Sequence, residues 1–219
     1  MTLILTAICK DGISICADRR YKITDSGGSV RNEDNHNKIY EFEQIPYVIL
    51  NHGINKIDNK DWKIYCSDYK NLGSWKGKNH FQIVNDFKEY IEGSVRKELS
   101  RYKDREKHAM GFLLGGKPPT EDKYKVTEIH WLQEDGEIKP TTSPVHTYKK
   151  DNLIITGSDD IKDYLIKYIE SNHAQYSNIS KIRKAEERLV TTFELAVKVK
   201  PTLRSNEFSD DYVVKSVRE

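Results

Sequence analysis

The first twenty residues, MTLILTAICKDGISICADRR, place a threonine directly behind the initiator methionine and an Asp-Arg-Arg cluster shortly after it. A threonine hydroxyl is a poor nucleophile at its ordinary pKa and needs a base within hydrogen-bonding distance. Once Met1 is removed, Thr2 carries a free α-amino group, whose unperturbed pKa of about 7.7–8.0 lets it act as that base. The alternative is that Thr2 is an ordinary residue of an N-terminal strand.

Two short strands would position this threonine. Leu3–Cys9 is predicted to be a strand that is apolar on both faces, and Ile13–Ala17 a strand with β-branched residues at alternate positions. Asp11-Gly12 between them is a tight-hairpin signal. A two-residue turn returns Asp18 and Arg20 to the end of the hairpin where the threonine lies. Their orientation stays open, because a slip of one residue changes which side chains share a face.

The rest of the chain alternates between strand and helix patterns. The polar stretch 24–37 is predicted to be a loop. The stretch 55–80 has no clean period and is predicted to be an irregular insertion, with a partly helical structure left open as the alternative. The remaining order is strands, one helix, strands, two helices and a strand, which predicts an antiparallel α+β fold in a single domain over residues 1–219. Helices are expected at 81–102, 161–170 and 179–197, and strands at 38–42, 47–50, 111–116, 124–132, 152–158 and 212–217.

Composition limits the classes of function. The 36 Lys and Arg residues nearly balance 34 Asp and Glu, which argues against a nucleic-acid partner. The start has no basic segment and too short an apolar run for a signal peptide or membrane span, and three cysteines do not make a disulfide framework. We therefore expect a cytoplasmic protein without a membrane partner. The seven histidines form no metal-binding motif, so neither a metal nor another cofactor is expected.

The order of the motifs resembles the proteasome β-subunits and their bacterial relative, the ring peptidase that works with an AAA+ unfoldase. The similarity covers nearly the whole chain except 55–80. It is carried by Thr2, Asp11-Gly12, Ala17-Asp18-Arg19-Arg20, Lys38-Ile39-Tyr40-Glu41-Phe42, Pro46-Tyr47 through Gly53, Gly111 through Gly116, Gly157-Ser158 and Ser205-Asn206-Glu207-Phe208.

The resemblance implies a four-layer α-β-β-α sandwich, the fold of N-terminal-nucleophile hydrolases, and a role for each matching residue. Lys38 would place a positive charge beside the Thr2 hydroxyl, Asp18 would orient Lys38, and Arg20 would brace their loop. Gly53 would donate its N–H to the oxyanion, and Ser158 would bind the α-amine. The substrate pocket would be polar, because its walls fall on Tyr21, His36, Asn51 and Asn55.

The implied activity is that of a threonine peptidase in a self-compartmentalising homo-oligomeric ring. Its substrate would be a peptide or an unfolded protein, and its partner an AAA+ ATPase. Lys200 stands where the family has an aspartate, and this departure favours a second hypothesis, a catalytically silent scaffold or binding protein on the same fold. A third hypothesis is an amidohydrolase that acts on small molecules, although such enzymes usually begin with Cys or Ser.

Overall fold

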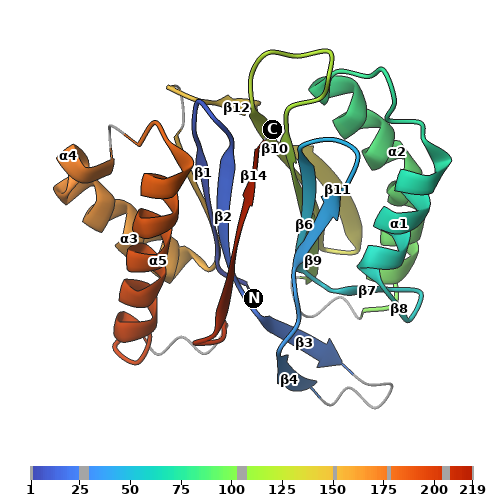
Figure 1. Ribbon diagram of the computed structural model, residues 1–219. Coiled ribbons are helices and arrows are strands. Elements are labelled where there is room, and N and C mark those ends of the chain that lie inside the picture. Colours follow the sequence, from blue (N-terminus) through green and yellow to red (C-terminus); the bar gives the residue numbers. More distant parts are fainter. Residues whose placement is uncertain are drawn as a thin grey trace. The chain divides into compact units, whose positions relative to one another are not determined.

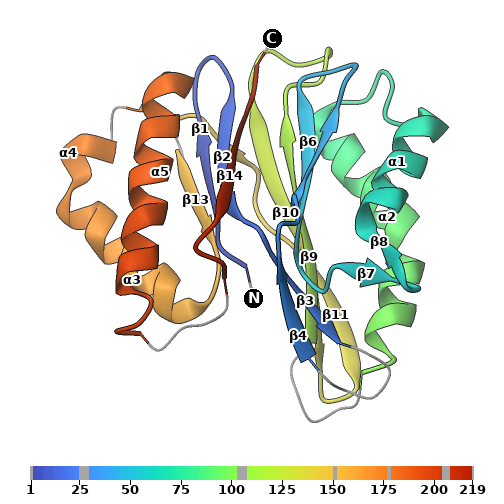
Figure 2. The same ribbon diagram turned by 60° about the horizontal axis from the view of Figure 1, so that its bottom comes forward.

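The computed structural model describes residues 2–24, 30–102, 108–149, 152–176, 179–203 and 208–218. The fold is α+β, and the neighbouring strands along each described sheet path pair antiparallel. The contacts divide the chain into two compact units, Met1–Lys38 with His146–Glu219, and Ile39–Val145. Figures 1 and 2 show the elements of both units.

The first unit is built on a sheet with the strand order β13-β1-β2-β14. Every residue of the two central strands is buried, including the polar residues Thr6, Ser14 and Asp18. For β1 this agrees with the predicted strand that is apolar on both faces. The turn between these strands differs from the expected one: the Cys9 N–H bonds the Gly12 carbonyl, so Lys10 and Asp11 are its central residues. The strands are β1 (Ile4–Ile8), β2 (Ile13–Asp18), β13 (Leu153–Thr156) and β14 (Tyr212–Val217), with the short β12 (His146–Thr147) preceding β13 in the chain.

Three helices belong to this unit, α3 (Asp159–Ser171), α4 (His173–Tyr176) and α5 (Ile182–Val199). They lie on one face of the β13-β1-β2-β14 sheet (Figures 1 and 2). Helix α5 packs on β1, β2 and β14, and its buried stripe joins the core between helices and sheet. This stripe has the helical spacing that the sequence predicts. It consists of Ile182, Ala185, Leu189, Thr192, Phe193 and Ala196.

A second, two-stranded sheet follows β2 directly. Strands β3 (Arg20–Thr24) and β4 (Val30–Asp34) pair from Arg20↔Asp34 to Thr24↔Val30. The expectation of a loop over residues 24–37 is therefore wrong for β4. The stretch is polar enough to resemble a loop, but an ion pair between the first residue of β3 and the last of β4 holds the two strands together.

The second unit contains a sheet with the strand order β11-β10-β9-β6-β5. Its strands are close to the expected ones, although β6, β9 and β10 are longer. Cross-strand pairs such as Ile49↔Leu114 and Ile129↔Phe112 fix its register. The strands are β5 (Ile39–Phe42), β6 (Tyr47–Gly53), β9 (His108–Gly116), β10 (Lys125–Glu134) and β11 (Glu137–Thr142).

One face of this sheet is covered by α1 (Trp62–Leu72) and α2 (His80–Leu99), as Figure 2 shows. The region expected to be an irregular insertion contains α1 and a small hairpin of β7 (Lys56–Ile57) and β8 (Lys60–Asp61). Helix α1 buries Trp62, Cys66 and Tyr69, which explains the aromatic content of this region. None of the helices in the described part of the chain is long and apolar enough to cross a membrane.

Candidate active site

Asp18 is the last residue of β2, and its buried carboxylate is the centre of the candidate site. Its Oδ1 accepts the Leu3 N–H at 2.9 Å, and its Oδ2 accepts the Arg20 N–H at 3.0 Å. In return, the Asp18 N–H donates to the Leu3 carbonyl at 3.0 Å. The β1–β2 hairpin therefore places Asp18 beside the first residues of the chain, as its predicted return requires.

Lys38 joins Asp18 to Thr2. Its Nζ donates to Thr2 Oγ1 at 2.7 Å and to Asp18 Oδ1 at 2.9 Å. The side chains of Lys38 and Asp18 are both 0% exposed, and Thr2 is buried as well. Three residues far apart in sequence thus form one chain of hydrogen bonds inside the first unit. Met1 lies outside the described residues.

The electrostatics of Lys38 suit a proton donor to an alkoxide. Burial lowers the pKa of the Lys38 ammonium because the charged form loses its hydration. The Asp18 carboxylate opposes this shift through its charge and its hydrogen bond, while the Arg20 guanidinium lowers the pKa further. Lys38 is therefore a more acidic donor than a surface lysine, and it points at the hydroxyl of Thr2.

Arg20 braces the adjoining hairpin. Its Nε and Nη2 donate to the two carboxylate oxygens of Asp34 at 2.6 Å and 2.7 Å, a bidentate pair. The hydrogen bond from Arg20 holds the pKa of Asp34 below its usual range. Arg20 thus stabilises the β3–β4 hairpin through its side chain and Asp18 through its backbone. The sequence alone places Asp34 in a loop and so misses this partner of Arg20. The pair could have been found from the acidic residue that lies opposite Arg20 when the two segments are aligned as a hairpin.

Ser209 is a second residue that the sequence analysis missed. Its Oγ accepts the Arg19 N–H at 2.9 Å and donates to the Asp211 carbonyl at 2.6 Å. Its own N–H reaches Asp18 Oδ2 at 3.4 Å. The tail motif singled out in the sequence ends one residue before Ser209, and residues 205–207 of that motif lie outside the described residues.

Ser158 is the N-cap residue of α3, and its side chain makes no hydrogen bond to the helix N-terminus. The β1–β13 register pairs Ile4 with Thr156, which brings the start of α3 to the N-terminal end of β1. A Cβ on Gly157 would lie 3.3 Å from the Thr2 carbonyl oxygen, so the backbones approach closely here. Ser158 therefore follows a residue that contacts the Thr2 backbone.

Tyr21 and His36, two of the expected pocket walls, contact each other near Arg20. Their rings stack with centroids 4.0 Å apart and an interplanar angle of 4°. The His36 Nε2 lies 3.1 Å from Glu33 Oε2, and its backbone N–H donates to the Arg19 carbonyl. Tyr21 is buried, so His36, which is part-exposed, presents the accessible side of the stack.

The other expected site residues, Gly53, Asn51 and Asn55, belong to the second unit. Gly53 has φ +79°, and a Cβ there would clash with the Ala109 carbonyl, so only glycine fits. The Asn55 amide donates to Asn51 Oδ1, and Asn51 Nδ2 donates to the Ile54 carbonyl at 3.2 Å. These bonds fix the loop after β6, and the roles of all three residues stay predictions.

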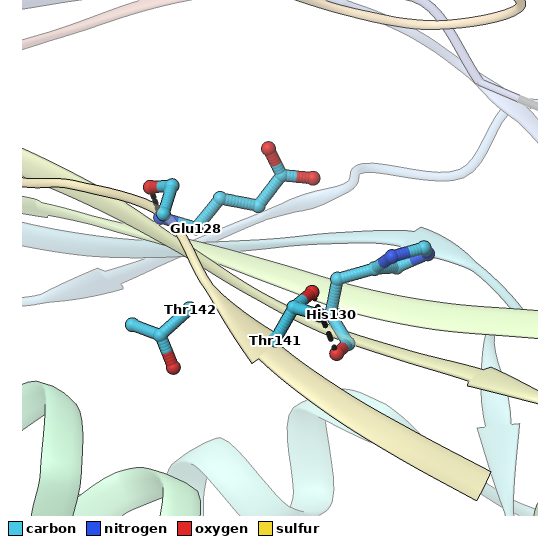
Figure 3. Close-up of a pocket in the computed structure, with 5 residues that line it drawn as sticks. Glu128, His130, Thr141 and Thr142 are labelled. Atoms are coloured by element: carbon cyan, nitrogen blue, oxygen red, sulfur yellow. Dashed lines mark hydrogen bonds between the residues drawn. The ribbon is translucent and has the colours of Figure 1, made fainter.

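A pocket of about 200 Å³ in the second unit is lined by Glu128, His130, Thr141, Thr142 and Ser143. Glu128 and His130 extend on one side of the strands and Thr142 on the other (Figure 3). The hydroxyls of Thr141 and Ser143 already donate to the carbonyls of His130 and Pro144. The Glu128 carboxylate lies 2.8 Å from His52 Nε2, so this carboxylate and both hydroxyls already have partners within the protein, and we assign no chemistry to the pocket. Among the described residues, no group of three His, Cys, Asp or Glu side chains could hold a metal ion.

Comparisons with known proteins point to one fold. No family model matches the chain, and no curated protein matches it. Similar solved structures include the Anbu complex of Pseudomonas aeruginosa, described as a helical assembly (TM-score 0.60, 11% identity, 99% of this chain and 81% of that one). Anbu of Yersinia bercovieri, described as an ancestral beta-subunit, has a TM-score of 0.59 and 12% sequence identity, and the match covers 99% of this chain and 81% of that one. The Gly-1 mutant of Anbu from Hyphomicrobium sp. strain MC1 has a TM-score of 0.57 and 11% sequence identity, and the match covers 100% of this chain and 82% of that one.

These findings correct the resemblance drawn from the sequence motifs. The identification as a proteasome β-subunit or bacterial ring peptidase is wrong, because the similar structures are Anbu chains and neither a family model nor a curated protein supports it. The motifs led to it because each is short, and only their order was specific. At identities of 11–12% the likeness shows the fold alone, and that fold is the one found in Anbu.

Proposed function

We propose that this chain is a self-assembling subunit with the Anbu fold and that its Thr2, once Met1 is removed, is the nucleophile of an amide-bond hydrolase. The observation that carries the proposal is the buried chain Thr2–Lys38–Asp18, with 2.7 Å and 2.9 Å between the hydrogen-bonded atoms. Buried lysine–carboxylate pairs are costly to form, so one that ends on the hydroxyl of an N-terminal threonine favours a chemical role over a merely structural one.

The chemistry follows from these groups. The free amine of Thr2 takes the proton of its own hydroxyl, and Oγ1 attacks the substrate carbonyl to form a tetrahedral intermediate. The Lys38 ammonium, held by Asp18, stabilises the negative charge that develops on Oγ1. The amine then passes the proton to the leaving nitrogen, the C–N bond breaks, and an ester on Oγ1 remains. Water, deprotonated by the same amine, hydrolyses that ester.

The remaining roles belong to the same proposal. The Gly53 N–H would bind the oxyanion, and Ser158 would hold the amine of processed Thr2. The substrate would be a peptide or an unfolded protein, and small or polar side chains would suit walls formed by Tyr21, His36, Asn51 and Asn55. We also propose the four-layer α-β-β-α arrangement, a location in the cytoplasm and delivery of substrate by an AAA+ ATPase.

The second candidate is a catalytically silent subunit, and the comparisons support it better than they support hydrolysis. The similar Anbu structures are described as an ancestral beta-subunit and as a helical assembly, and neither description mentions a cleaved substrate. Lys200 also favours this candidate, because the expected aspartate would fix the amine of Thr2 and a lysine there cannot accept that bond.

The two candidates differ in whether Thr2 can be acylated. The protein is purified in its assembled form, the mass of its N-terminal peptide is measured, and it is treated with a peptide vinyl sulfone or a β-lactone. An active site gives one adduct per processed chain, located on Thr2 by mass spectrometry. Processed protein that takes up no adduct, with or without its ATPase, leaves the silent subunit. Retention of Met1 in protein from the native host also leaves only that candidate.

A further inference from the structure

The feature that the proposed chemistry does not use is the cationic side chain of Lys200, just after α5. Its Nζ donates to the Phe208 carbonyl oxygen at 2.7 Å and to Asp210 Oδ1 at 2.7 Å. It also lies 4.9 Å from the centre of the Phe208 ring. The Lys200 side chain is 12% exposed and that of Asp210 is 71% exposed. Three contacts thus hold this lysine against the turn that follows residue 207.

The peptide group that Lys200 binds also contacts the candidate site. The carbonyl of Phe208 and the N–H of Ser209 belong to one peptide group, and this N–H reaches Asp18 Oδ2 at 3.4 Å. A cation on the carbonyl polarises the peptide group and strengthens donation by its N–H, because hydrogen bonds in series reinforce one another. The Lys200 charge is also felt within the site, where it helps to lower the pKa of Asp34.

The turn itself is attached to the hairpin that carries Asp18. Ser209 Oγ and the Asp211 carbonyl both accept the Arg19 N–H, at 2.9 Å and 3.2 Å. The Phe208 ring is buried and packs at 5.9 Å from the ring of Phe193 in α5. The turn is therefore anchored on one side by the core, on the other by Arg19, and at its central peptide by Lys200.

We infer that Lys200 is a positioning residue of the Thr2 site, which acts through the 208–209 peptide group on Asp18 and so on Lys38. This inference rests on the proposed function and deepens it. The Ser209 N–H draws part of the Asp18 charge away from Lys38, and the nearby ammonium adds positive potential. Both effects favour an unprotonated amine on Thr2 and an acidic donor at Lys38. A lysine where an aspartate was expected is then a component of the site and not a sign of lost chemistry.

The test uses three variants of the processed, assembled protein. Lys200→Met keeps the length of the side chain and removes its charge, Lys200→Arg keeps the charge, and Asp210→Asn removes only the exposed partner of Lys200. The rate of Thr2 labelling by a β-lactone is measured from pH 5 to pH 10. We expect Lys200→Met to label roughly three- to tenfold more slowly at pH 7 and both limbs of its pH profile to move to higher pH. The other two variants should keep the limbs of the wild type.

A merely structural role would lower the amplitude of labelling and leave the limbs unmoved, and that result, or an unchanged Lys200→Met, would overturn the inference. Hydrogen exchange separates this inference from the proposed function. Exchange at the Ser209 amide should be about tenfold faster in Lys200→Met and unchanged in Asp210→Asn, whether or not Thr2 can be labelled. If wild-type protein takes up no adduct but this exchange pattern appears, the proposed hydrolase fails while the link from Lys200 to Asp18 stands. Unchanged exchange overturns the link.

Discussion

Lys38 and Asp18 are fully buried side chains whose Nζ and Oδ1 atoms lie 2.9 Å apart, inside a sheet region where every neighbouring residue of β2 is also buried. Two opposite charges in such a place must compensate each other, because neither has water to replace its partner. The pair is therefore both a structural liability and the means by which a positive charge is held against the Thr2 hydroxyl.

Removing one member of this pair should be costly. Lys38→Met leaves the Asp18 carboxylate buried without its counter-ion and should lower the free energy of unfolding by about 3–5 kcal/mol in urea titrations. Because Asp18 keeps three backbone N–H donors, the lower end of this range is expected. The double variant Lys38→Met/Asp18→Asn should be less destabilised than the sum of the single variants. Strict additivity would contradict the coupling of the two charges.

Thr2 should be dispensable for folding and indispensable for acylation. Thr2→Ala removes one hydrogen bond to Lys38 and should cost about 1 kcal/mol of stability while abolishing the adduct with a vinyl sulfone. Thr2→Ser keeps the hydroxyl and should retain reduced labelling. Combining Thr2→Ala with Lys38→Met should lower labelling no further, because the groups act as one unit. An adduct on the N-terminal peptide of Thr2→Ala would refute Thr2 as the nucleophile.

His80 should make the stability depend on pH. Its ring lies between Tyr47 Oη at 3.0 Å and Thr127 Oγ1 at 2.9 Å, and burial lowers its pKa to about 3. The unfolded chain binds a proton on this ring at about pH 6.5, whereas the folded chain does not until about pH 3. The neutral ring therefore makes its full contribution to the free energy of unfolding above pH 6.5. This contribution is lost as the pH falls toward 3, by roughly 1.4 kcal/mol per pH unit.

The control for this prediction is His80→Gln, which does not titrate in this range. The difference in unfolding free energy between wild type and His80→Gln should shrink by about 2 kcal/mol between pH 6.5 and pH 5. Comparing the two proteins cancels the carboxylates that also titrate in acid, such as Asp34 and Asp86. A difference that stays constant over this interval would show that His80 takes up its proton in the folded protein at the same pH as in the unfolded chain.

Assembly should depend on the apolar side chains that α1 and α2 expose. Phe81 is 63% exposed and Leu72 65% exposed, and a helix interface in a homo-oligomer is the expected use of such side chains. Phe81→Ser should shift the assembled protein toward smaller species in sedimentation velocity at micromolar concentration. Arg183→Ser on α5, whose side chain is 92% exposed, should leave the distribution unchanged. A wild-type protein that sediments only as a stable monomer would contradict self-assembly.

The sequence by itself predicted the helices and strands whose apolar residues recur at a regular spacing. The helix now seen at His80–Leu99, the strands of the β1–β2 hairpin and the final strand follow from the spacing of apolar residues, because that spacing depends only on local geometry. It also placed Asp18 and Thr2 at the same end of the hairpin. The family assignment was wrong, because short motifs in a plausible order do not distinguish one family from a distant one of similar fold.

Only the tertiary structure decided which polar residues meet. Strand β4 was missed because its sequence is polar, and it becomes a strand through the Arg20–Asp34 pair. Helix α1 was not located from the sequence because only Trp62, Cys66 and Tyr69 carry its buried stripe, and this short stripe lies in a stretch that is otherwise rich in Lys, Asn and Asp. Ser209 contacts the site from the other end of the chain, 191 residues away from Asp18, and Lys200 binds the carbonyl of the same peptide group. Local propensity carries no information on such contacts, because they form only when distant strands pair and bury the same charge.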